Sequence, residues 1–221
     1  MFAKELISDR VPSVKSTDTA GLALDWMGEF KLHQLPIVDH GAYKGMITEN
    51  DILDASDLSD RIGDIKYSGW DSAYIHEDQH PYDAIEIMSN LKLEVLPVLD
   101  EENLYMGVVT LRDLIAFLGN LLALHEPGGI VVLRIPGNGY VLSEIGRIAE
   151  SADAKVLSLY LSNDTSINEY LLTLKLNVQD LSRVVAAFER FRYEVVRTYH
   201  RGEQVDDYRQ NLDALLRYLD I

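Results

Sequence analysis

Two stretches of the sequence repeat one pattern about sixty residues apart. The segment HQLPIVDHGAYKGMITENDIL (33–53) aligns with EVLPVLDEENLYMGVVTLRDLI (94–115). Pro36 matches Pro97 at an offset of 61 residues, whereas Asp51 matches Asp113 at an offset of 62, so the extra residue falls in the turn between two strands. Turns tolerate such insertions. The duplication constrains the fold strongly, because both copies must form the same elements.

Each copy predicts the element order β-α-β-β-α. The helices carry apolar residues at positions i, i+3, i+4 and i+7, and the strands are short apolar runs bounded by polar turns. The first copy predicts strands at 12–15, 35–38 and 45–48, with helices from Ala20 and Thr48. The second copy predicts strands at 73–75, 95–99 and 107–110, with helices from Pro81 and Thr110.

A threonine followed three residues later by an aspartate starts the second helix of each copy. Thr48 and Thr110 are candidate N-caps, and Asp51 and Asp113 then occupy the third position of the first turn. This is the pattern of a capping box, which satisfies free N–H groups at a helix N-terminus. The two pairs therefore have a structural explanation before any functional one.

The duplicated pattern, with hP(I/V)xD and Ghh(T)xxD in both copies, resembles a tandem CBS domain pair, also called a Bateman module. The resemblance covers about residues 8–124 within a predicted domain of residues 1–124, as repeats of about 8–65 and 70–124. It implies that the repeats pack through their sheets and bind an adenosine ligand in clefts between them. The implied ligands are AMP, ADP or ATP (with Mg²⁺) and S-adenosylmethionine. Dimerisation through the helices that follow Asp51 and Asp113 is also implied.

Carried onto this sequence, the resemblance implies two sets of nucleotide-binding residues. The aspartate of each T-x-x-D motif accepts hydrogen bonds from the ribose hydroxyls, and the threonine lies by the ribose and phosphate. The strand around the proline, and the first strand with its corner, frame the adenine. The implied residues are Thr110, Asp113, Arg112, Leu96, Pro97, His76 and Asp78 for one cleft and Thr48, Asp51, Leu35, Pro36 and Thr17 for the other.

The two motifs differ in charge. TLRD places Arg112 beside the aspartate as a partner for phosphate, whereas TENDIL offers Glu49 and Asn50 and no base. Residues 1–124 contain 22 Asp/Glu and 9 Lys/Arg, so a free polyphosphate approaches this half against a repulsive field. A phosphorylated nucleotide is therefore expected at the second motif rather than the first.

A different pattern follows a linker expected at 124–128, where Pro127 and neighbouring glycines interrupt the chain. Residues 128–200 predict strand-helix-strand-strand-helix-strand, a ferredoxin-like βαββαβ unit. Its order and length resemble an ACT domain, a regulatory module that often binds amino acids at dimer interfaces. Tyr140 stands where that family's ligand-loop glycine belongs, so we expect this domain to serve assembly rather than amino-acid sensing. Residues 201–221 predict an amphipathic helix.

The stretch YIHEDQHPYDA (74–84) contains the zinc-protease pattern H-E-x-x-H. A zinc site of that kind needs both histidines on one face of a helix. Pro81 follows His80 and favours extended geometry there, so the helix is expected to begin at or after Pro81. The two histidines therefore belong to a corner, and we predict no metal site.

Composition excludes several classes of function. The net charge of −16 argues against a nucleic-acid or anionic-membrane partner. Cysteine is absent, which removes disulfides and thiolate ligands, and no apolar run is long enough for a membrane helix. The first residues lack the apolar segment of a secretory signal, so a cytoplasmic location is expected. No nucleophile elbow, phosphate loop or dinucleotide fingerprint is present, so we predict no enzyme.

The expected fold class is α+β: tandem CBS repeats followed by a ferredoxin-like, ACT-like domain. This order of domains resembles the acetoin-utilisation regulatory proteins. The leading hypothesis is a regulatory protein whose CBS pair senses an adenosine ligand and relays it, through rearrangement of a homodimer, to an unidentified protein target. The alternative is a ligand-free dimeric assembly or scaffold protein with vestigial clefts. Neither hypothesis requires a cofactor.

Overall fold

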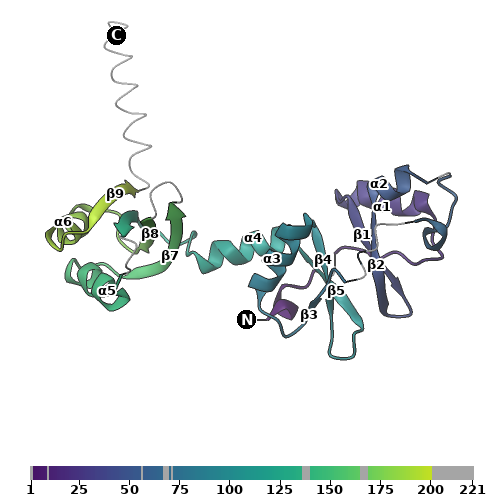
Figure 1. The fold of residues 1–221 in the computed structure, drawn as a ribbon, viewed down its shortest axis with the longest axis horizontal. Coiled ribbons are helices and arrows are strands. Elements are labelled where there is room, and N and C mark those ends of the chain that lie inside the picture. The colour runs from purple at the N-terminus through teal and green to yellow at the C-terminus, as the bar shows by residue number, and fades with distance from the viewer. Residues whose placement is uncertain are drawn as a thin grey trace, which may run out of the picture. The chain divides into compact units, whose positions relative to one another are not determined.

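The computed structural model describes residues 2–8, 10–55, 57–66, 70, 72–135, 140–164 and 169–200. The chain divides into two compact units, Met1–Phe117 and Leu118–Ile221 (Figure 1). The amphipathic helix predicted at 201–221 lies outside the described residues. Among the helices that the structure describes, none combines the length and apolar character that a bilayer crossing requires.

The first repeat consists of α1 (Ala20–Phe30), β1 (Gln34–Asp39), β2 (Ala42–Thr48) and α2 (Glu49–Leu53). The strands β1 and β2 form an antiparallel hairpin with a bulge between Ile37 and Val38. The hydroxyl of Thr19 caps α1 by accepting a hydrogen bond from the N–H of Leu22 over 3.3 Å. The helix ends at Lys31, which has a left-handed backbone with φ of 57°. The strand predicted at 12–15 is reduced to one parallel bridge between Val14 and Ile37.

The second repeat has the same plan, with β3 (Ile75–His76), α3 (Pro81–Leu91), β4 (Val95–Leu99), β5 (Tyr105–Thr110) and α4 (Leu111–Leu121). The strand β3 is parallel to β4, and β4 is antiparallel to β5. His80 caps α3, since its Nδ1 accepts a hydrogen bond from the N–H of Tyr82 over 3.2 Å. The start of this helix at Pro81 is confirmed. Lys92 ends α3 with φ of 56°, at the position that Lys31 occupies in the first repeat.

The segment that precedes the first helix of each repeat, here called its leading segment, packs into the core of the other repeat. The short helix η1 (Ala3–Leu6) precedes the first repeat, yet Ala3 is fully buried in the core of the second repeat with Ile75 and Met88. The short helix η2 (Ile62–Asp64) precedes the second repeat, yet Ile62 is buried in the core of the first. Figure 1 shows the purple N-terminal segment beside β3. Each core is therefore completed by residues from the other copy.

The sheets of the two repeats meet in a small buried cluster. It is formed by Met46 of β2, Val95 of β4 and Val108 of β5, all fully buried. The side chains of Tyr43 and Tyr105 pack around it. Burial raises the pKa of Tyr105 to about 12. The expected packing through sheets is therefore present.

The second unit has a four-stranded antiparallel sheet with two helices, which are β6 (Ile130–Ile135), α5 (Leu142–Ser151), β7 (Val156–Asp164), β8 (Glu169–Leu176), α6 (Ser182–Arg190) and β9 (Glu194–Tyr199). The strand order is β7-β8-β6-β9, which is the order of a ferredoxin-like βαββαβ fold. Every pairing in this sheet is antiparallel. The predicted α+β fold class is confirmed.

Alternate residues of the second sheet face its two helices. Val131, Leu133 and Ile135 of β6 are fully buried in one cluster with Phe188 of α6. The other face of β6 carries Arg134, whose guanidinium binds Glu169 and Glu194 at 3.0 Å each. The period of two along β6 therefore separates a helix-covered face from a polar one.

A glycine is required where the second unit begins. Gly128 has φ of 155°, and a Cβ added there would lie 1.8 Å from the carbonyl oxygen of Leu176. Only a residue without a side chain permits the chain to enter β6 at this distance from β8.

Candidate functional site

The T-x-x-D motif of the second repeat forms a capping box at the junction of β5 and α4. The hydroxyl of Thr110 donates to Oδ2 of Asp113 over 2.6 Å, and the N–H of Thr110 donates to the same oxygen over 3.1 Å. The N–H of Asp113 donates back to the Thr110 hydroxyl over 3.2 Å. Both residues are therefore held in place by each other, as the sequence predicts.

The second carboxylate oxygen of Asp113 is uncommitted. Its Oδ1 accepts no hydrogen bond from the part of the chain that the structure describes, because all three bonds of the box use Oδ2 and the threonine hydroxyl. Asp113 also lines a surface cleft. A rigid carboxylate oxygen in a cleft is suited to accept hydrogen bonds from a ligand's hydroxyl groups.

The cleft beside Thr110 and Asp113 has a volume of about 650 Å³. Both repeats contribute to it: the N-terminal segment and the end of α1 come from the first, and the start of β4 and the T-x-x-D motif from the second. The apolar part of the wall consists of Ile7, Val11, Phe30, Leu32 and Leu111. A volume of this size accommodates a small organic molecule.

Three basic residues line the same cleft. Arg112 was expected from its place in the motif, whereas Arg10 and Lys31 were not. Both come from the first repeat, far from Thr110 in sequence. The duplication did not reveal Lys31, because its counterpart Lys92, at an offset of 61 residues, does not line this cleft.

Glu94 lines the cleft and is held by a residue of the first repeat. Its Oε2 accepts the N–H of His33 over 2.8 Å, and its Oε1 lies 2.8 Å from Nδ1 of the same histidine. The other ring nitrogen of His33 lies 3.8 Å from Oε2 of Glu49. The hydrogen bond that the His33 ring makes to the Glu94 carboxylate is the main cause that raises the pKa of His33, and the charge of Glu49 adds to it.

The motif of the first repeat forms the same box. The hydroxyl of Thr48 donates to Oδ2 of Asp51 over 2.6 Å, and the N–H of Asp51 donates to the Thr48 hydroxyl over 3.2 Å. Its helix α2 then begins with Glu49, the residue beside His33. Of the other residues implied for this cleft, Leu35 and Pro36 are buried in β1 and Thr17 is exposed in the corner before α1.

The remaining residues implied for the second cleft do not line it. Leu96 and Pro97 are buried within β4. His76 pairs with Leu99, at the far end of β4 from Val95, which pairs with Thr110. Asp78 lies in the turn that follows β3. The length of β4 therefore separates His76 and Asp78 from the T-x-x-D motif.

The corner that contains His76 and Asp78 docks the N-terminal segment. The carbonyl oxygens of Gln79 and Glu77 accept hydrogen bonds from the N–H groups of Ala3 and Lys4 over 2.8 and 3.1 Å. The ammonium of Lys4 lies 3.0 Å from Oε2 of Glu77, which raises the pKa of the lysine. Among the described residues, no cluster of His, Asp and Glu has the arrangement of a metal site.

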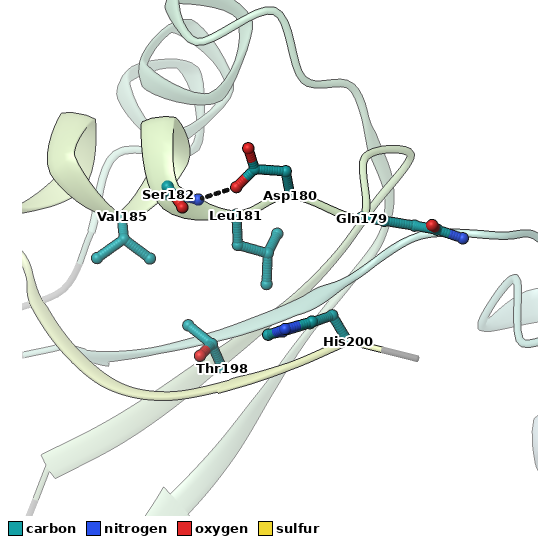
Figure 2. Close-up of a pocket in the computed structure, with 7 residues that line it drawn as sticks. All are labelled: Gln179, Asp180, Leu181, Ser182, Val185, Thr198 and His200. Carbon is teal, nitrogen blue, oxygen red and sulfur yellow. Dashed lines mark hydrogen bonds between the residues drawn. The ribbon is translucent and has the colours of Figure 1, made fainter. Parts of the chain in front are cut away.

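A second hollow of about 570 Å³ lies in the C-terminal unit, between the start of α6 and the end of β9 (Figure 2). Asp180 accepts the N–H of Ser182 there over 3.0 Å, and this bond is the main cause that lowers the pKa of Asp180. Figure 2 shows His200 and Thr198 on the opposite wall. The sequence offered no signal for this hollow, because its two walls come from segments that form no motif.

The two repeats have the same plan and share one cleft, so the first unit is a duplicated β-α-β-β-α module. A model of the CBS domain family matches residues 3–58 and 62–120, which together are about half of the chain. The chain therefore belongs to the CBS domain family, and its first unit is a tandem CBS pair, as predicted.

Relatives of this chain share the CBS region. The chain is 32% identical over 114 residues to an inosine-5'-monophosphate dehydrogenase from Methanocaldococcus jannaschii, a match that covers 51% of this chain and 23% of that enzyme. It is 28% identical over 114 residues to the CBS domain-containing protein YhcV of Bacillus subtilis, covering 50% of this chain and 81% of that protein. This chain thus spans less than a quarter of the dehydrogenase's length.

Among solved structures, a CBS domain pair/ACT domain protein from Thermotoga maritima is similar in fold and sequence. The identity is 27% and the TM-score is 0.51, over 55% of this chain and 99% of that chain.

Proposed function

We propose that the CBS pair is a non-catalytic regulatory module that senses an adenosine nucleotide at the cleft beside Thr110 and Asp113. The observation that carries this proposal is the uncommitted Oδ1 of Asp113 in a cleft of about 650 Å³. A carboxylate oxygen accepts strong hydrogen bonds from a vicinal diol such as that of ribose.

The rest of the cleft supplies what the other parts of a nucleotide need. The apolar side chains Val11 and Leu32 offer a surface for a flat base. The basic residues and the N-terminus of α4 offer positive charge to phosphate. The cleft therefore matches a ligand with an apolar base, a diol and an anionic tail.

Because the walls come from both repeats, a bound ligand ties the first repeat to the second. A ligand that binds one arrangement of the repeats more tightly shifts the population toward it, and this differential affinity is all that a relay requires. We propose that the shift passes through a homodimer to a separate protein target or to the C-terminal unit.

For the C-terminal unit we propose an ACT-like assembly domain, in a protein related to the acetoin-utilisation regulators. The sheet order β7-β8-β6-β9 supports this proposal, as does the domain composition named for the Thermotoga maritima protein. Tyr140 packs partly buried against the core of this unit, in the region where that family binds its ligand. We therefore propose no amino-acid site there.

A ligand-free assembly protein is the second candidate, and exposed apolar residues on α4 favour it. Ile115 is 69% exposed and Leu111 is 44% exposed. Apolar side chains that gather on one helix are typical of an interface between subunits. Both candidates therefore include a homodimer, and they differ in whether a ligand binds.

Thermal unfolding of the full chain with AMP, ADP, ATP, ATP with Mg²⁺, S-adenosylmethionine and amino acids separates the two candidates. A ligand that binds only the folded state raises the midpoint. We expect an adenosine compound to stabilise the wild type and Asp51→Ala but not Asp113→Ala. Asp51 is the matched control because it has the same place in the other box. If every compound leaves the midpoint unchanged, the assembly protein is the better description.

A further inference from the structure

The helices α5 and α6 cover one face of the sheet in the C-terminal unit. The leucines of β8 at positions 172, 174 and 176 are fully buried in the cluster that these helices complete. Thr173 and Lys175 alternate with those leucines and therefore belong to the opposite face, here called the open face. The strand pairing places one residue of each strand in a row across the open face: Tyr160, Thr173, Val132 and Arg197.

The open face combines apolar surface with positive charge. Tyr160 is 46% exposed, and Val132 is half-buried. Arg134 is neutralised by two glutamates. In the part of the chain that the structure describes, no carboxylate lies within 4.0 Å of Lys175 or Arg197. The face therefore suits a partner that presents apolar side chains flanked by acidic ones.

The linker that enters this unit closes one end of the open face. Oγ of Ser158 donates a hydrogen bond to the carbonyl oxygen of Leu122 over 2.9 Å. Nζ of Lys175, which pairs across the strands with Ser158, donates to the carbonyl oxygen of Gly128 over 3.2 Å. Tyr160 lies two residues further along β7 and is still largely exposed. The surface that a partner can cover thus begins at the row of Tyr160.

Residues 201–221 have the complementary pattern in their sequence. Four leucines recur at the spacing of one helix face: Leu212, Leu215, Leu216 and Leu219. Three aspartates recur every seven residues: Asp206, Asp213 and Asp220. A spacing of seven is close to two helical turns, so in a helix these aspartates follow one flank of the leucine stripe. The segment contains five Asp/Glu and three Arg, a net charge of −2.

The segment also follows directly from the border of the open face. The strand β9 forms one edge of the sheet and ends at Tyr199, and Leu212 comes 13 residues later. An extended chain of that length spans about 40 Å. Four strands at a spacing of about 4.8 Å are only about 14 Å across. A helix from Leu212 to Leu219 is about 10 Å long, so its stripe matches the width of the sheet.

We propose that residues 201–221 dock as an amphipathic helix on the open face of their own C-terminal unit. The leucines pack over Tyr160 and Val132, and the flanking aspartates face Lys175 and Arg197. Burial of the leucine stripe supplies most of the stabilisation, and the opposite charges orient the helix on the sheet. The unit then has helices on both faces of its sheet, and the cleft of the CBS pair takes no part in this contact.

Chemical cross-linking in the full chain tests the placement. The chain has no cysteine, so introduced cysteines are its only thiols. We expect a short bismaleimide to join Tyr160→Cys to Leu216→Cys within one chain, seen as a linked peptide pair in the monomer band of a denaturing gel. Arg217→Cys is the first control, because Arg217 lies on the other side of the helix from the leucines. Arg183→Cys on α6, the helix that covers the opposite face, is the second.

Thiol labelling measures how strongly the segment docks. In the full chain, Tyr160→Cys should be protected from a thiol reagent. Adding Leu215→Asp should speed its labelling at least about tenfold, because one buried leucine is lost. Arg197→Gln and added salt should also speed the labelling, since both weaken the charge contacts. Arg183→Gln is the matched control, because it removes a cation from α6 and should leave the rate unchanged.

Circular dichroism confirms that each variant is folded, and the outcomes then decide. A cross-link found only in the dimer band overturns docking on the same chain and assigns the segment to the partner subunit. A stronger link from Leu216→Cys to Arg183→Cys than to Tyr160→Cys places the segment over α6 and also overturns the proposal. If no pair is joined and Leu215→Asp leaves the labelling of Tyr160→Cys unchanged, the face is open in solution and the proposal is wrong.

Discussion

The hydroxyl of Thr110 lies 2.6 Å from Oδ2 of Asp113, so the two carboxylate oxygens of the aspartate have different roles. Oδ2 belongs to the capping box, while Oδ1 is open to the cleft. Thr48 and Asp51 repeat the same 2.6 Å contact in the other copy. A substitution in either box therefore has a structural effect that must be measured beside any effect on a ligand.

Replacing Thr110 tests how much the capping box stabilises α4. We expect Thr110→Ala to lower the free energy of unfolding by about 1 kcal/mol, because α4 loses its cap. Thr48→Ala should cost a similar amount at α2, and Thr110→Ser should restore most of the loss, since serine keeps the hydroxyl. Urea denaturation followed by circular dichroism measures all three. Equal stability of Thr110→Ala and the wild type would show that the box does not stabilise α4.

Gly107→Ala tests how closely the N-terminal segment is fitted to the second repeat. Gly107 has φ of 147°, and a Cβ added there would lie 2.6 Å from Cγ2 of Ile7, which lines the cleft. We expect a loss of about 1–3 kcal/mol in unfolding free energy from the backbone strain and this clash. Ligand binding should weaken as well, because the cleft wall moves.

Gly28→Ala is the matched control for that substitution. Gly28 lies within α1, and an added Cβ meets nothing within 4 Å. Alanine is favoured over glycine in a helix, so this variant should be stabilised by about 0.5–1 kcal/mol. If both glycine variants change stability in the same direction, the contact between Gly107 and Ile7 is not the cause.

His33 makes the link between Glu94 and Glu49 depend on pH. The pKa of His33 is raised above its ordinary 6.5 by Glu94 first and Glu49 second, the two acidic groups that face it. Its stabilising charge is fully present below pH 6.5 and is lost as the pH rises through the folded value. Proton NMR should show a histidine titrating above 6.5. In Glu94→Gln that resonance should move toward the ordinary value; an unchanged titration would rule out Glu94 as the cause.

Tyr105 reports on the packing between the two sheets. Burial raises its pKa to about 12, from an ordinary value of 10. Because the folded state disfavours the phenolate, stability should fall as the pH rises from about 10 toward 12. An ultraviolet titration of the wild type against Tyr105→Phe isolates this phenol. If the difference between the two titration curves has its midpoint near pH 10, the ring of Tyr105 is not buried.

Local signals predicted most of the fold. Pro81 marked the start of α3, and the Thr48 and Thr110 boxes formed as their spacing indicates. The order of elements in the C-terminal unit followed from its alternating pattern, and the sheet β7-β8-β6-β9 agrees with it. The strand expected at 12–15 was the exception, since only Val14 pairs there.

The cleft was less predictable because its parts are brought together only by the tertiary fold. Thr110, Arg112 and Asp113 are contiguous and carry a motif, so the sequence revealed them. Arg10 and Lys31 reach the same cleft from the other repeat, and no local spacing connects them to it. His76 was assigned to the cleft by its position in the repeat, but its pairing with Leu99 places it at the other end of β4.

The crossed leading segments make the two repeats inseparable. A piece of this chain cut directly after α2 would keep Ala3, which is buried in the core of the second repeat, and would lose Ile62, which is buried in the core of the first. The smallest part that closes both cores therefore contains both copies and both leaders. Rearrangement of the gene can add or remove this pair as a whole, whereas a single copy would have a cavity in its hydrophobic core.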